Sequence, residues 1–220
     1  MRSAVVVFPG SNCDRDLVDA LSTHSERACR MIWHEDTSLP VGIDIVFIPG
    51  GFSFGDYLRC GAIAANSPIM ASIIKFAKKG GYVVGICNGF QVLTESGLLS
   101  GTLMRNSQLT FICKQQSLII NNSETIMTKY FSKSEEISLP IAHHDGNYYA
   151  DDETIKKLED NGQILFRYNG NPNGSKDQIA GIMSSNQRVL GIMPHPERAV
   201  DESLGTTHGS KIFKSIIESF

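Results

Sequence analysis

Short β-branched runs alternate with stretches of helical spacing along this chain, and no other feature of the sequence limits the fold as strongly. AVVVF at 4–8 has the composition of a buried strand, and a helical pattern follows it at 14–24. A second helical pattern at 68–81 precedes another strand-like run, YVVGI, at 82–86. Because such alternation is typical of parallel strands joined by crossover helices, the sequence predicts an α/β fold with a doubly wound, mostly parallel sheet flanked by helices.

The second half of the chain changes this pattern. Apolar and polar residues alternate along segments 102–120 and 125–131, which indicates antiparallel strands. No repeat, low-complexity segment or linker divides the chain, so residues 1–220 are expected to form a single domain. Further strands are expected at 28–34, 43–51, 163–168, 179–184 and 189–197, and further helices at 88–99 and 210–220.

Composition excludes several classes of partner and location. The 220 residues are 41% hydrophobic, and the formal net charge of -3, with charges mixed along the chain, gives no reason to expect nucleic acid or an anionic membrane. No apolar run approaches the about 18 residues of a membrane span, and the first run is too short for a secretion signal, so a cytoplasmic location is expected. The five cysteines form no CxxC pair, which favours neither a disulfide framework nor a zinc site.

Cys87 lies at a predicted corner between a strand and a helix. Gly85-Ile86-Cys87-Asn88-Gly89 has the form G-x-nucleophile-x-G, in which the flanking glycines allow a sharp turn. A helix that begins at this turn offers free N–H groups and a positive dipole end, and both favour a thiolate. The alternative is a buried structural cysteine at an ordinary turn, since cysteine is among the most buried residue types.

His195 and Glu197, within the segment IMPHPER, supply the residue types that a thiol nucleophile needs. A base must accept and return the proton, and a carboxylate must fix the tautomer of that base. Pro194 and Pro196 favour an extended backbone, in which residues two apart project to the same side. The alternative is a proline turn with a surface charge.

The other five histidines are weaker candidates for a role in catalysis or metal binding. His24, His34 and His208 are expected to face solvent. The neighbours His143 and His144 should point to opposite faces, which suits metal binding poorly.

Attack on an amide creates an oxyanion that needs two preorganised donors. The N–H of Asn88, directly after Cys87, is one candidate. Within the segment 43–51, Gly50 and Gly51 follow the strand proper at 43–48, at its carboxyl end, where open α/β sheets place ligands, and supply the second. A plain turn at the end of a strand is the alternative, whereas a phosphate-binding loop is disfavoured because no Gly-Lys-Ser/Thr follows.

Four segments together resemble the class I glutamine amidotransferases: PGGFSFGDYLRCGAIA, GICNGFQVLTESGLL, RNSQLTFIC and MPHPER. More narrowly, CNGFQ with GGFSFGDYLR is similar to the glutaminase subunits of phosphoribosylformylglycinamidine synthase. The likeness extends over nearly the whole chain. It implies the flavodoxin-like fold of class I glutaminases with a small antiparallel addition.

The resemblance also implies roles for individual residues. Cys87 would be the nucleophile, His195 the general base and acid, and Glu197 the orienting partner of His195. Gly51 and Asn88 would form the oxyanion hole, and Gln91 would help to hold glutamine.

His144 and Asp145 depart from the Ala-His-Gly-Glu-Gly that is usual in this family. The remaining cysteines are expected to be uninvolved: Cys13 has no visible base, Cys60 is a small buried residue, and Cys29 and Cys113 belong to the core.

The implied activity is hydrolysis of glutamine to glutamate and ammonia within purine biosynthesis. Ammonia would pass to a large synthetase subunit that converts formylglycinamide ribotide to its amidine, with a small accessory subunit as a third member. This chain would need no metal or organic cofactor of its own, since ATP and Mg²⁺ would be bound by the synthetase. The alternatives are a stand-alone cysteine hydrolase, such as a γ-glutamyl peptidase, and a binding module that retains the G-x-nucleophile-x-G turn without catalytic activity.

Overall fold

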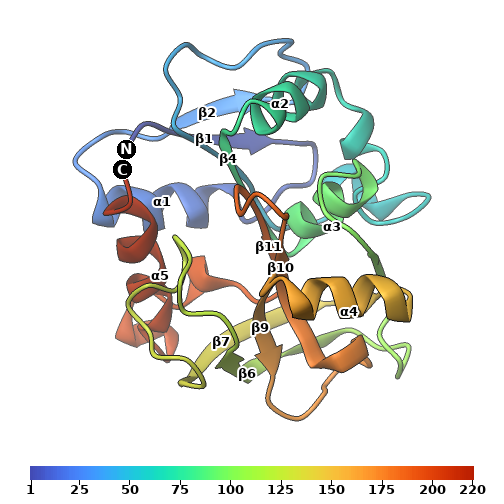
Figure 1. The fold of residues 1–220 in the computed structure, drawn as a ribbon. Coiled ribbons are helices and arrows are strands. Elements are labelled where there is room, and N and C mark those ends of the chain that lie inside the picture. Colours follow the sequence, from blue (N-terminus) through green and yellow to red (C-terminus); the bar gives the residue numbers. More distant parts are fainter.

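The computed structural model describes all residues 1–220 and contains one nine-stranded sheet and one two-stranded sheet. Figure 1 shows the large sheet running through the molecule, with both chain ends side by side at one edge. The strand order of the large sheet is β2-β1-β3-β4-β11-β10-β9-β6-β7. A single hydrophobic core of 52 buried residues extends through both halves of the sheet.

The first half of the sheet is parallel. The strands of this half are β1 (Ser3–Val7), β2 (Arg30–Trp33), β3 (Ile45–Ile48), β4 (Tyr82–Ile86) and β11 (Val189–Ile192). All except β2, which lies at the edge and is mostly exposed, are short buried apolar runs, as interior parallel strands require. Ile86 at the end of β4 pairs with Ile192 at the end of β11, so the segments that follow both strands emerge side by side.

The second half is antiparallel, and it is the antiparallel addition that the sequence predicts. It continues the same sheet through β10 (Ile179–Met183), β9 (Ile164–Tyr168), β6 (Ile112–Ile120) and β7 (Glu136–His143). The separate small sheet pairs β5 (Thr102–Met104) with β8 (Asn147–Tyr149). The predicted fold class is therefore confirmed, with four parallel and four antiparallel pairings in the large sheet.

The crossover helices cover both faces of the parallel strands. Figure 1 shows α1 and α5 on one side and α2 and α3 on the other. The helix α1 joins β1 to β2 and α2 joins β3 to β4, so these two right-handed crossovers run in opposite directions along the sheet and lie on opposite faces. The helices are α1 (Asp14–His24), α2 (Pro68–Lys78), α3 (Asn88–Glu95), α4 (Asp152–Asp160) and α5 (His208–Ile217). No helix is both long and apolar enough to span a membrane.

The helices and strands predicted from the sequence agree best with the structure in the parallel half. The helix at 14–24 and the strand at 82–86 have the predicted bounds, whereas the strand predicted at 125–131 is wrong, because that segment forms consecutive turns. There the Thr125 hydroxyl accepts from the N–H of Met127 and bonds the Thr128 hydroxyl at 2.6 Å, so local side-chain bonds replace a strand ladder. Helix α4 is an addition to the predicted elements, and Asp151 caps it by accepting from the N–H of Thr154.

Four placements of single side chains also differ from expectation. His34 is buried and stacks edge-on against Phe54, so it does not face solvent. Cys113 is exposed near the start of β6, and Cys29 is only half-buried, so neither is a core cysteine. Cys60, expected to be buried, is also only half-buried. Sequence alternation alone does not say which face of an edge strand a neighbouring element covers.

Candidate active site

Cys87 lies directly between β4 and α3, at the corner that the sequence predicts. Its backbone has φ 50° and ψ −106°, with the positive φ that non-glycine residues rarely adopt, and its side chain is buried. Such a conformation costs of order 1–3 kcal/mol and persists only where surrounding structure enforces it. The thiol is held 3.9 Å from the carbonyl oxygen of Ala142 at the end of β7.

Two glycines make this corner possible. A Cβ on Gly89 would lie 1.9 Å from the carbonyl oxygen of Ile48, and a Cβ on Gly85 would lie 2.5 Å from that of Gly89. The first turn of α3 therefore rests directly on the ends of β3 and β4. The predicted reason for the glycines, a sharp turn without side-chain clashes, is confirmed at both positions.

His195 and Glu197 form a buried pair. Nδ1 of His195 shares a hydrogen bond of 2.5 Å with Oε1 of Glu197, and neither side chain is more than 2% exposed. Glu197 lies in a short 3₁₀ turn, Pro196–Arg198, so the prediction that the strand continues to 197 is wrong. Pro196 takes the first position of that turn, where its missing N–H costs nothing. Burial of Glu197 also contradicts the alternative of a surface charge.

Two opposing effects set the protonation of His195. Burial alone lowers the pKa of His195, whereas the carboxylate of Glu197 and the thiolate of Cys87 raise it, and the result lies well above the ordinary value. Nε2 of His195 and Oε2 of Glu197 are buried and have no hydrogen-bond partner in the protein. An imidazolium next to a sulfur favours a thiolate, and the free Nε2 is available to a reacting group.

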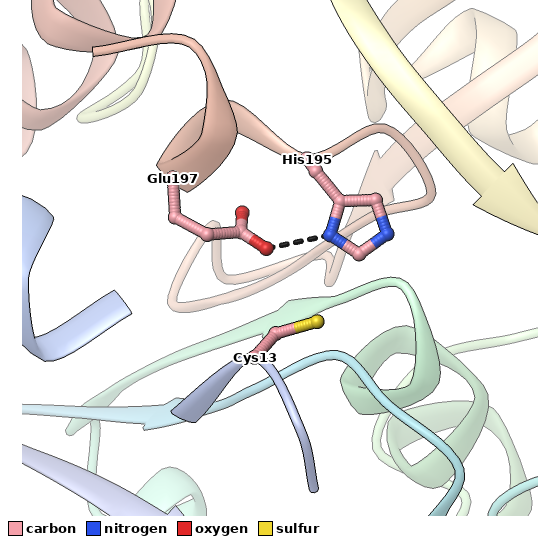
Figure 2. A group of neighbouring side chains, drawn as sticks. All are labelled: Cys13, His195 and Glu197. Carbon is pink, nitrogen blue, oxygen red and sulfur yellow. Dashed lines mark hydrogen bonds and ion pairs between the residues drawn. The ribbon is translucent and has the colours of Figure 1, made fainter. Parts of the chain in front are cut away.

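Cys13 lies beside the same pair, which the sequence did not indicate. Its sulfur, the imidazole of His195 and the carboxylate of Glu197 place one ligand atom each within 4.8 Å of one another, and Figure 2 shows the sulfur directed toward the ring. The expectation that Cys13 has no neighbouring base is therefore wrong. Burial raises the pKa of the Cys13 thiol, against the effect of His195, which lowers it. No local motif could have revealed this neighbour, because only the strand order brings the end of β1 close to that of β11.

Gly50 leaves open the space on which these groups converge. A Cβ on Gly50 would lie 2.8 Å from Cε1 of His195, 3.2 Å from Sγ of Cys13 and 3.4 Å from Cβ of Cys87. Both cysteines and the imidazole thus border one small space at the carboxyl ends of the parallel strands. Any larger residue at position 50 would displace the ring.

The two expected oxyanion donors have free N–H groups. Gly51, with φ 135°, and Asn88, at the start of α3, donate no backbone hydrogen bond within the protein. The side chain of Asn88 connects the two segments, because its Oδ1 accepts from the N–H of Ser53 at 3.3 Å. A Cβ on Gly51 would lie 2.6 Å from the backbone nitrogen of Asn12, so the glycine is required there.

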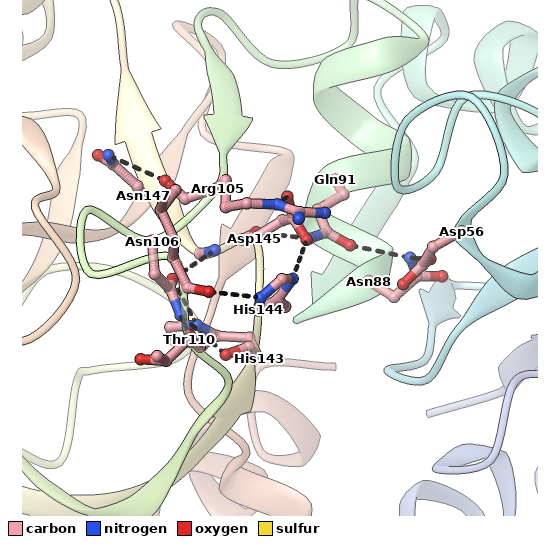
Figure 3. A network of polar contacts seen from close by, with 12 residues as sticks. Asp56, Asn88, Gln91, Arg105, Asn106, Thr110, His143, His144, Asp145 and Asn147 are labelled. Atoms are coloured by element: carbon pink, nitrogen blue, oxygen red, sulfur yellow. Dashed lines mark hydrogen bonds and ion pairs between the residues drawn. The ribbon is translucent and has the colours of Figure 1, made fainter.

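Gln91 is buried, and its amide is bonded within the protein. Its Nε2 donates to the carbonyl oxygen of Asp145 at 2.6 Å, and its Oε1 accepts from Nδ2 of Asn88 at 2.8 Å (Figure 3). Gln91 therefore links the nucleophile helix to the loop at His144 and Asp145, where this chain departs from the family pattern. Its expected contact with glutamine stays a prediction.

Asn106 organises that loop through four hydrogen bonds. Its backbone N–H donates to the carbonyl oxygen of His144 at 2.8 Å, and its Nδ2 donates to that of His143 at 2.9 Å. Its Oδ1 accepts from Nδ1 of His143 at 3.0 Å and from the N–H of Gly146 at 3.1 Å (Figure 3). Burial lowers the pKa of His143 to about 4, with the charge of His195 as a second cause, so this ring is neutral at neutral pH. His144 is only half-buried, which agrees with the prediction that the two histidines face opposite ways.

Comparison with known proteins identifies the family to which the chain belongs. Residues 1–212 match the family described as CobB/CobQ-like glutamine amidotransferase domain. Phosphoribosylformylglycinamidine synthase subunit PurQ of Roseobacter denitrificans is 58% identical over 216 residues, which cover 98% of this chain and 97% of that protein. The PurQ subunit of Nostoc sp. is 53% identical over 219 residues, or 99% of this chain and 97% of the relative.

Solved structures extend the comparison to the fold. A chain of the PurLQS structure from Thermotoga maritima is 43% identical, with a TM-score of 0.91 over 99% of this chain and 98% of the other. The glutaminase domain of Trypanosoma brucei CTPS with bound acivicin, at only 16% identity, shares the fold with a TM-score of 0.64 over 99% of this chain and 94% of that domain. The chain belongs to the glutamine amidotransferase family and, within it, to the group of phosphoribosylformylglycinamidine synthase PurQ subunits.

Proposed function

We propose that this chain is the glutaminase subunit of a phosphoribosylformylglycinamidine synthase, and that it hydrolyses L-glutamine to glutamate and ammonia. The observation that carries the proposal is the buried His195–Glu197 pair next to a strained cysteine at a helix N-terminus. A sulfur nucleophile, a base with a fixed tautomer and free N–H donors are what acyl transfer from an amide requires. The PurQ relatives, which are more than half identical over nearly their whole length, support the same activity.

The first half-reaction forms a thioester. The thiolate of Cys87 attacks the side-chain amide carbon of glutamine, and the N–H groups of Gly51 and Asn88 stabilise the oxyanion. His195 then gives its proton to the departing nitrogen, so the carbon–nitrogen bond breaks and ammonia leaves. The raised pKa of His195 suits this step, because the ring is protonated before attack.

The second half-reaction removes the γ-glutamyl group. His195, now neutral, takes a proton from water, and the resulting hydroxide attacks the thioester carbon. The carbon–sulfur bond breaks, which releases glutamate and restores the thiolate. Glu197 holds Nδ1 throughout, so Nε2 is the atom that exchanges the proton. These steps use side chains and backbone N–H groups of this chain, together with water.

Cys87 rather than Cys13 is assigned as the nucleophile for two reasons. Cys87 directly precedes Asn88, whose N–H is a free donor at the position where the oxyanion forms. Cys13 has an ordinary φ of −107°, and burial raises its pKa, so its sulfur stays protonated.

Delivery of ammonia to a partner completes the proposed function. Free ammonia would be protonated in neutral water, so a large synthetase subunit would receive it directly and use ATP and Mg²⁺ to convert formylglycinamide ribotide to its amidine in the cytoplasm. Exposed apolar side chains on the loops around the site support docking of such a subunit: Tyr57 is 74% exposed, Leu58 86% and Leu109 70%. A small accessory subunit would complete the complex, by analogy with PurLQS of Thermotoga maritima.

Reconstitution tests this proposal. The purified chain alone is expected to release glutamate slowly from glutamine, and addition of the synthetase and accessory subunits should accelerate release and yield the amidine in equal amount. A γ-glutamyl peptide, tested without partners, should be a poor substrate. Rapid hydrolysis of the peptide by the isolated chain, with no response to the partners, would instead establish a stand-alone hydrolase.

A further inference from the structure

We propose that Cys13, His195 and Glu197 form an inhibitory binding site for Zn²⁺ or a similar thiophilic divalent metal ion. The spacing of cysteines along the sequence argues against such a site, and only the fold creates it. Binding of the metal follows from the geometry alone. Its inhibitory effect rests on the function proposed above, because the ion would occupy the catalytic base and its partner.

The three donors suit zinc in type and position. One thiol, one imidazole and one carboxylate provide sulfur, nitrogen and oxygen ligands, and their donor atoms all lie within 4.8 Å of one another. With bonds of about 2.0–2.3 Å, ligands of a tetrahedral zinc ion lie roughly 3.3–3.8 Å apart. The nearest pair, Nδ1 of His195 and Oε1 of Glu197, is 2.5 Å apart and must separate by about 1 Å as the ion replaces the shared proton.

Burial and charge also favour the ion. All three side chains are buried, and Oε2 of Glu197 has no hydrogen-bond partner, so a donor without a protein contact lies within the cluster. A Cys13 thiolate and the Glu197 carboxylate together balance the charge of Zn²⁺ once the imidazole is neutral. The Cys13 proton and the proton that Nδ1 of His195 shares with Glu197 are both released to solvent on binding, because metal ligands must be deprotonated. The fourth position of the ion is left for water, as in zinc sites with three protein ligands.

An entry path reaches the cluster from the surface. A cavity of about 570 Å³ is lined by His195 and Glu197 and bordered by Asp16 and Asp19 of α1. Carboxylates at the mouth raise the local concentration of cations. Asp16 also pairs with Arg198 at 3.0 Å, which leaves Asp19 as the unpaired charge at this opening.

The test uses Co²⁺ as a spectroscopic substitute for Zn²⁺, with the full chain first freed of metal by a chelator. A thiolate bound to Co²⁺ gives a near-ultraviolet charge-transfer band that does not depend on turnover. We expect this band in the wild-type chain and in Cys87→Ser, whose nucleophile is removed but whose cluster is intact. We expect it to disappear in Cys13→Ser and to persist in Cys113→Ser, the matched control, because Cys113 lines the same cavity outside the cluster.

Inhibition is measured in parallel. Zn²⁺ should abolish glutamate release by the wild-type complex, a chelator should restore it, and Cys13→Ser should raise the inhibitory Zn²⁺ concentration at least about tenfold without changing turnover in metal-free buffer. Thermal unfolding of each variant checks that the fold is kept. No band in the wild-type chain, or a band that disappears in Cys87→Ser and survives in Cys13→Ser, would overturn the metal site. A band without inhibition would leave the metal site standing and overturn the catalytic role of His195.

Discussion

Two junctions of the parallel sheet each place a cysteine at the N-terminus of a helix, and the two differ in how the chain reaches that helix. At the second junction Cys87 follows β4 without any intervening loop and adopts φ 50°. At the first, a loop separates β1 from Cys13, which has φ −107° before α1. Both cysteines border the same small space as the His195 ring, but only the direct turn combines a strained residue with a free N–H next to it. On the proposed assignment of Cys87 as nucleophile, the backbone conformation at the cysteine, and not proximity to His195 alone, distinguishes the two junctions.

Replacing each cysteine in turn gives the largest expected contrast. Cys87→Ala removes the atom that forms the thioester, so kcat for glutamate release should fall by at least about 10⁴-fold. Cys13→Ala, at the other junction, should leave kcat nearly unchanged in metal-free buffer. Initial rates of glutamate formation by the reconstituted complex measure both, and equal losses in the two variants would contradict the assignment.

Gly89→Ala tests whether the direct turn requires contact between helix and strand. The new methyl group would lie 1.9 Å from the carbonyl oxygen of Ile48, so β3 and α3 must separate. The free energy of unfolding should decrease by about 3–4 kcal/mol, as for overpacked core positions. Gly97→Ala is the matched control: Gly97 has positive φ but no atom within 4 Å of the added carbon, so it should lose only about 1 kcal/mol. Urea titration at pH 7 compares the variants.

Acid should lower the stability of the fold through His143, the last residue of β7, the strand that ends beside Cys87 at the second junction. Burial lowers the pKa of His143 to about 4, whereas an unfolded histidine titrates near 6.5. The unfolded chain therefore binds the additional proton between these values, and stability decreases as the pH falls from 6.5 to 4, by up to about 3 kcal/mol. In His143→Gln this part of the pH dependence should be absent. Urea unfolding at pH 7 and pH 4.5 measures the difference, and an identical loss of stability in the two proteins would contradict it.

Glu197→Gln should lower turnover less than Cys87→Ala does, and it tests the shared base rather than either cysteine. The carboxylate no longer raises the pKa of His195, and the ring loses its fixed tautomer. We expect kcat to decrease by roughly 10²-fold, less than for Cys87→Ala because the nucleophile is retained. Alkylation of Cys87 at neutral pH should slow in parallel, since the imidazolium that favours its thiolate is weakened. Unchanged kcat would mean that Glu197 serves only packing.

The sequence by itself determined the local features of this protein. The alternation of β-branched runs and helical patterns fixed the parallel half, and the glycines around Cys87 fixed the sharp turn, because both depend on neighbours within a few residues. The pairing of His195 with Glu197 was also local, although Pro196 produced a 3₁₀ turn instead of a strand. The motifs indicated the family because each of them is a short run of consecutive residues.

Tertiary structure decided what depends on contacts between distant segments. The order of strands brought Cys13 to His195, opened the space above Gly50 and bonded Gln91 to the loop at Asp145. Hydrophobic periodicity records which face of an element is buried but not which element covers it, so these contacts could not be predicted from one sequence.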